Sequence, residues 1–167
     1  HKLGDSGASQ DHYEQSMNLK QAFALNNPGD PMARRDVANM HIRIATVLAN
    51  SAQHEQALKQ HTQALLINTE LFNTDGEHIA THRRACGLGH SYVAVCLLEL
   101  DRPEEAGEHY VQCLTLLSEN LQLNPSDTRT RSNIESRLEE SYRDRFSGED
   151  VEPQVEAARN VLESTGN

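Results

Sequence analysis

Apolar side chains recur at three- and four-residue steps through most of the chain, which is the period of an amphipathic helix. One such stripe joins Val37, His41, Ile44, Ala45 and Leu48. No segment longer than a few residues shows the alternation typical of a β-strand. Proline, glycine and polar clusters separate the periodic stretches. The pattern predicts an all-α chain with about seven helices, near residues 9–26, 32–50, 54–72, 78–100, 103–123, 127–146 and 153–164.

The central part of the chain matches itself when it is shifted by 49 residues. Large, small and turn positions all find counterparts. In the predicted first helix, His41, Ile44, Ala45 and Leu48 fall on His90, Val93, Ala94 and Leu97. In the predicted second helix, Ala57, His61 and Ala64 fall on Ala106, Tyr110 and Cys113. The arginine pair at 34–35 falls on the pair at 83–84. Amphipathic periodicity alone would not also align a turn and a charged pair. The match therefore predicts two copies of a helical hairpin.

Weaker copies flank these two, and they predict one repeat domain over residues 1–167. It would comprise a half repeat at 9–26, full repeats at 32–72 and 78–123, and a degenerate terminal repeat at 127–164. Terminal repeats are commonly atypical because one of their sides faces water.

The repeated motifs resemble a known family. Ala57-x-x-x-His61-x-x-Ala64 and its copy resemble the second helix of tetratricopeptide repeats, and Ile44-Ala45-x-x-Leu48 is similar to the first helix. The resemblance implies a right-handed superhelical stack of antiparallel helix hairpins, an α-solenoid whose concave groove binds peptides. The period of 49 residues exceeds the family's usual repeat of about 34. It fits an extended variant found in bacterial signalling and regulatory proteins.

Carried over by position, the resemblance places ten residues in the peptide groove: Asn39, Ile42, Arg43, Thr46, Leu88, Ser91, Tyr92, Val95, Tyr142 and Arg143. The alternative is that several of them pack against a neighbouring helix. Ile42 and Ser91 stand where the family's clamp for acidic chain ends has a basic residue, so chaperone tails are not the expected ligand.

Arginine is clustered near the starts of the long predicted helices. Arg34, Arg35, Arg83 and Arg84 could form a ridge along one edge of the stack, suited to carboxylate or phosphate groups. The alternative is that these arginines pair with acidic residues of adjacent repeats.

Histidine and cysteine raise the question of metal binding. His78, His82, Cys86 and His90 step by four along one predicted helix. Cys86 and His90 lie on its apolar face, so we expect only His78 and His82 to be exposed, as a weak candidate metal pair. Cys86, Cys96 and Cys113 all lie in apolar helical sequence, which indicates buried, reduced thiols and a cytoplasmic location.

Charge and composition narrow the function classes. The chain of 167 residues carries a net charge of −10, which disfavours nucleic-acid binding, and it has no apolar run long enough to cross a membrane. No glycine-rich phosphate loop or nucleophile motif points to an enzyme or a cofactor. We therefore expect a non-enzymatic scaffold that binds a protein or peptide and can self-associate through the open ends of the stack. Two alternatives are a regulatory segment of a larger signalling enzyme, such as a bacterial protein kinase, and a metal or small-ligand binder at the histidine pair.

Overall fold

The computed structural model describes residues 4–166, and it describes side chains from Gln15 onward except those of residues 140 and 141. Every regular element within this range is a helix, which confirms the all-α prediction. The helices are α1 (Gly4–Asn26), α2 (Pro31–Asn50), α3 (His54–Thr74), α4 (Ile79–Glu99), α5 (Pro103–Leu123), α6 (Thr128–Leu138), α7 (Glu140–Arg143) and α8 (Val151–Thr165). No helix within residues 4–166 is both long and apolar enough to span a bilayer.

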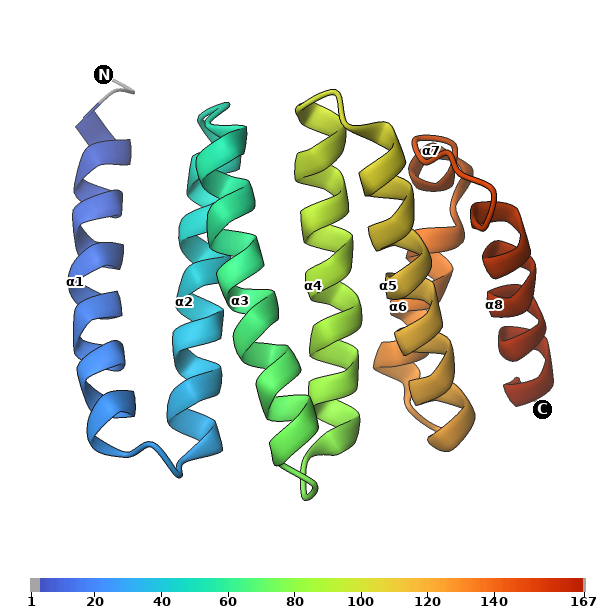
Figure 1. Ribbon diagram of the computed structural model, residues 1–167, viewed down its shortest axis with the longest axis horizontal. Helices are drawn as coiled ribbons and strands as arrows, with labels where there is room; N and C mark the ends of the chain where they lie inside the picture. The colour runs from blue at the N-terminus through green and yellow to red at the C-terminus, as the bar shows by residue number, and fades with distance from the viewer. Residues whose placement is uncertain (1–3, 167) are drawn as a thin grey trace.

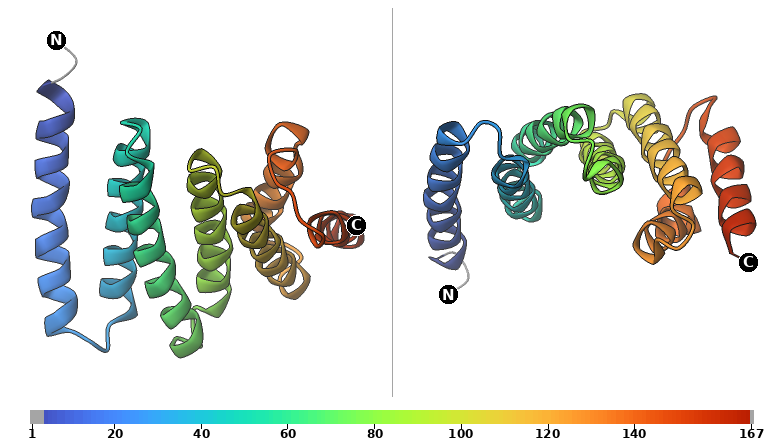
Figure 2. Two further views of the ribbon diagram at one scale, coloured as in Figure 1. Left: turned by 45° about the horizontal axis from the view of Figure 1, so that its top comes forward. Right: turned by 90° about the horizontal axis from the view of Figure 1, so that it is seen from below.

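The long helices stand side by side in chain order, and the two chain ends lie at opposite ends of the row (Figure 1). From α1 to α5, each helix packs against the next. Helix α3 contacts both α2 and α4. Seen along the helices, α3 lies to one side of that pair (Figure 2, right). The first helices of two successive hairpins therefore share α3 as a common neighbour.

The turns between α2 and α3 and between α4 and α5 have the same backbone. Ala52 and Asp101 both adopt a left-handed conformation with φ of +57°. In each turn the following amide donates a hydrogen bond of 2.9 Å to the carbonyl five residues earlier. This arrangement ends one helix within a single turn and reverses the chain. The 49-residue interval of the sequence thus recurs in backbone geometry.

Small residues let the helices approach closely. Ala45, Ala57 and Ala106 are fully buried where neighbouring helices meet. A Cβ atom on Gly89 of α4 would lie 3.0 Å from Cδ1 of Leu65 in α3. Leucine side chains of three successive helices, Leu65, Leu97 and Leu114, belong to one buried apolar cluster.

The prediction of one continuous helix over 127–146 is wrong. Helix α6 ends at Leu138, and Glu139 has extended backbone with φ of −57° and ψ of 134°. The single turn α7 and a loop follow before α8 begins at Val151. The break allows the ring of Phe146 to stack on Tyr110 of α5, with centroids 4.3 Å apart and planes 8° apart. Burial of this aromatic pair favours the interrupted backbone over a continued helix.

Candidate functional site

A groove of about 370 Å³ lies between α2, α3 and α4. It is lined by Arg35, Asn39, Ile42, Asn68, Thr81, Arg84, Ala85, Leu88 and Tyr92. The α2 residues are spaced by four and three, and the α4 residues fall on similar steps, so each helix contributes one face. Asn68 comes from α3, which packs against both of the other helices.

The groove brings together part of the predicted peptide-binding set. Asn39, Ile42, Leu88 and Tyr92 line it from two successive hairpins. Arg43 is exposed farther along α2, outside the lining. Thr46 is also exposed, and its hydroxyl donates to the Ile42 carbonyl at 2.9 Å.

The remaining predicted groove residues lie elsewhere. Half-buried Val95 of α4 is outside the groove lining. Ser91 is 1% exposed, and its hydroxyl lies 2.6 Å from that of Tyr142 and accepts a hydrogen bond of 2.7 Å from Arg137 Nε. Arg143 contacts the Asp144 carboxylate at 2.7 Å. The Ser91–Tyr142 contact therefore joins α4 to the C-terminal part of the chain.

The four arginines of the predicted ridge divide into two kinds. Arg34 forms an ion pair with Glu70, and Arg83 Nε lies 4.0 Å from the Glu119 carboxylate. These two pairs are themselves 49 residues apart. The second member of each arginine pair behaves differently, since Arg35 and Arg84 line the groove. Neither guanidinium has a hydrogen bond or ion pair with any residue that the structure describes.

Other polar groups in the groove also lack protein partners. Asn68 is only 3% exposed, yet its side chain makes no hydrogen bond within the described part of the chain. The Tyr92 ring stacks on the imidazole of His61, with centroids 5.2 Å apart. Burial lowers the pKa of His61 to about 4, so this imidazole is neutral near pH 7. The groove thus combines an apolar surface with unpaired donors and no lining carboxylate, an arrangement that suits an oxyanion.

The expectation that His78 and His82 are both exposed is wrong. His82 is 2% exposed, and its Nε2 lies 2.9 Å from Oδ2 of Asp75, which also lies 3.1 Å from His78 Nδ1. The hydrogen bond from His82 is the main cause that lowers the pKa of Asp75. Helical spacing of the histidines gives no sign of this contact, because the turn before α4 brings Asp75 to them. Within the described residues, no three His, Cys, Asp or Glu side chains are grouped so that they could hold a metal ion.

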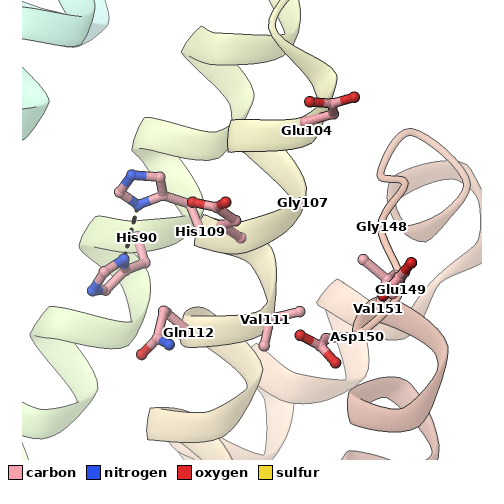
Figure 3. A pocket seen from close by; sticks show the side chains of 11 residues that line it. His90, Glu104, Gly107, His109, Val111, Gln112, Gly148, Glu149, Asp150 and Val151 are labelled. Atoms are coloured by element: carbon pink, nitrogen blue, oxygen red, sulfur yellow. Dashed lines mark hydrogen bonds between the residues drawn. The ribbon is translucent and has the colours of Figure 1, made fainter.

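A second pocket, of about 470 Å³, lies beside α5 (Figure 3). The Nδ1 atoms of His90 and His109 are 2.9 Å apart there, so one ring donates a hydrogen bond to the other. Burial, with the nearby His109, lowers the pKa of His90 to about 4. In Figure 3 the carboxylates of Glu149 and Asp150 lie across α5 from the imidazole pair. These two carboxylates therefore do not converge with the imidazole pair.

The cysteines are buried and unpaired, as predicted for Cys86, Cys96 and Cys113. Burial raises the pKa of Cys113 to about 12 and also raises that of Cys86. Such thiols are poor nucleophiles near pH 7 because the reactive thiolate is scarce.

The N-terminal end of the row exposes apolar side chains on α1. Leu19, Phe23 and Leu25 are 75%, 56% and 80% exposed. Self-association through an open end of the row stays a prediction.

Comparison of the chain with models of protein families, with curated proteins and with solved structures finds no match.

Proposed function

We propose that the chain is a non-enzymatic scaffold that binds an extended segment of a partner protein in the groove between α2 and α4. One observation carries this proposal: four residues predicted for peptide binding, from two copies of the hairpin, line a single groove. They are Asn39, Ile42, Leu88 and Tyr92. Apolar side chains beside free polar groups are typical of surfaces that hold peptides.

We also propose that the row of helices is a right-handed α-solenoid similar to tetratricopeptide repeats. Several interactions recur at the 49-residue interval and support this interpretation. His41 Nδ1 lies 2.6 Å from Gln60 Oε1, and His90 contacts His109 at the equivalent place. The Arg34–Glu70 and Arg83–Glu119 pairs repeat in the same way. Equivalent contacts at a fixed interval are expected where each repeat packs against the next.

Each part of the groove has its own role in the proposed interaction. Ile42, Leu88 and the Tyr92 ring provide apolar contact area, while Asn39 offers hydrogen bonds to the backbone of the bound segment. The guanidinium groups fix the register of that segment by pairing with its acidic positions. A regulatory segment of a larger signalling enzyme would use the same groove.

Selection from a phage-displayed peptide library tests the proposal. Peptides enriched on the full chain are synthesised, and their dissociation constants are measured by fluorescence anisotropy. The double variant Ile42→Ala, Leu88→Ala should weaken binding at least about tenfold, because it removes apolar contact at the centre of the groove. Thr46→Ala on the same helix is the matched control and should bind normally. Failure to enrich any peptide, or equal weakening by the control, would contradict the proposal.

A further inference from the structure

We propose that Arg35, Arg84 and Asn68 form a phosphate-binding site, so that the scaffold recognises a phosphorylated side chain on its partner segment. This inference deepens the proposed peptide-binding function and depends on it. The ligand class is a phosphopeptide, identified by the unpaired donors that the groove presents.

Adjacent arginines at the start of α2 and of α4 differ in their partners. Arg34 and Arg83 pair with acidic residues of the second helix of their own hairpins. Arg35 and Arg84, one residue later in each copy, line the groove without such a partner. A chain with 25 acidic residues and 15 basic ones offers many carboxylates for pairing. Neither Arg35 nor Arg84 forms a hydrogen bond or an ion pair with a described residue, although Arg84 interacts electrostatically with Asp127.

The side-chain amide of Asn68 is a further donor in the groove. Asn68 as a whole is only 3% exposed, but its amide atoms are not fully enclosed by protein, so the amide is accessible from the groove. Asn68 lines the groove and makes no hydrogen bond to any described residue. A bound oxyanion would accept a hydrogen bond from its amide nitrogen and satisfy it. The hydroxyl of Tyr92, which also has no partner among the described residues, supplies a further donor.

The charged groups that line the groove favour a phosphate over a single carboxylate. No carboxylate lines the groove, although the chain carries a net charge of −10. The charge of a phosphate monoester approaches −2 at pH 7. Two guanidinium groups match this charge better than they match the single negative charge of a carboxylate. Three terminal oxygens can also engage donors from three helices at once, whereas a carboxylate has two oxygens. An extended nucleic acid would be repelled by the acidic surface.

One acidic group on a neighbouring element acts on these arginines. Asp127, at the start of α6, is the acidic group that interacts electrostatically with Arg84. Its carboxylate already accepts hydrogen bonds from Thr130 at 2.6 Å and from Asn120 at 3.2 Å. Asp127 is therefore held by its own helix cap and does not line the groove.

Degenerate peptide libraries provide the test. Fluorescent nonapeptide pools with phosphoserine, serine or glutamate at the central position are titrated into the full chain and measured by anisotropy. We expect the phosphoserine pool to bind at least about tenfold more tightly than the serine pool, and more tightly than the glutamate pool. Arg35→Gln and Arg84→Gln should each remove most of this preference. Arg43→Gln, an exposed arginine of α2 outside the groove, is the matched control and should leave the preference intact.

The outcomes separate this inference from the function on which it depends. Equal binding of the three pools, or an unchanged phosphoserine preference in both arginine variants, would overturn the phosphate site. In that case, library peptides that still bind and are weakened by Ile42→Ala, Leu88→Ala would leave the peptide-binding proposal standing. If no pool and no selected peptide binds, both proposals fail. Circular dichroism of each variant establishes that it is folded before binding is compared.

Discussion

Ala52 and Asp101 occupy equivalent positions in two hairpin turns, 49 residues apart, and share the same left-handed backbone with φ of +57°. Neither is glycine, so each turn holds an L-residue in a conformation that costs about 1–2 kcal/mol. Both copies have kept this geometry with different side chains. The same turn geometry is therefore compatible with an apolar and with an acidic side chain.

Replacing Ala52 by glycine should stabilise the protein. Glycine adopts positive φ without steric cost, and this gain exceeds the extra entropy it loses on folding. We expect the free energy of unfolding to rise by about 1 kcal/mol. Urea denaturation measures this change. Ala49→Gly, three residues earlier and inside α2, is the control and should destabilise by about 1 kcal/mol. A loss of stability in Ala52→Gly would contradict the assigned turn.

Replacing Gly107 by alanine should destabilise the C-terminal end of the row. A Cβ atom at this position of α5 would clash with the backbone carbonyl oxygen of Ser147. Because that atom belongs to the main chain, the loop between α7 and α8 must shift, at a cost of about 1–3 kcal/mol. Thermal unfolding followed by circular dichroism measures the effect.

Gly76→Ala is the matched control for this prediction. No atom lies within 4 Å of a Cβ built on Gly76, and its backbone is not left-handed. That variant should melt within a degree or two of the parent protein. Unchanged melting of Gly107→Ala would show that the loop does not pack on α5 as described.

The free energy of unfolding should decrease as the pH is lowered below 6.5. Burial lowers the pKa of His61 from 6.5 to about 4, and the pKa of His90 falls to the same value. Between these limits the unfolded chain binds protons that the folded chain does not, so acid favours unfolding. Urea midpoints should therefore be lower at about pH 5 than at about pH 7.

A variant isolates the contribution of His61 to this pH dependence. His61→Phe keeps an aromatic ring against Tyr92 but cannot be protonated. Its urea midpoint should change less between the two pH values than that of the parent protein. The carboxylate of Asp75 acts in a separate range, since its lowered pKa affects stability only under more acidic conditions. Identical pH dependence in parent and variant would contradict the burial of a neutral His61.

The sequence was sufficient to predict most helices because their apolar stripes are regular. The same regularity led to the wrong prediction of one continuous helix over residues 127–146. Ile134, Leu138, Tyr142 and Phe146 follow one another at four-residue steps, which is also the pattern of an unbroken helix. The stacking of Phe146 on Tyr110 is a contact over 36 residues, and local periodicity contains no information about it.

The candidate site was predictable in part. The resemblance to tetratricopeptide repeats, carried over by position, pointed to Asn39, Ile42, Leu88 and Tyr92, which the structure brings into one groove. The sequence did not distinguish Arg34 from Arg35, because adjacent helical residues differ in direction by about a quarter turn and both lie near the helix start. Only the packing of α3 shows which arginine pairs with an acidic partner. The contribution of Asn68 was missed, since it lies on α3 among residues that pattern alone assigns to packing.

Amide chemical-shift mapping of a selected peptide on the full chain tests the central claim most directly. Binding in the groove should perturb amides of α2 between Arg35 and Ile42 and amides of α4 between Thr81 and Tyr92. The shifts should saturate with a dissociation constant that agrees with the anisotropy measurement. Perturbations confined to α5 and α8, or spread over the chain without these two stretches, would contradict the account.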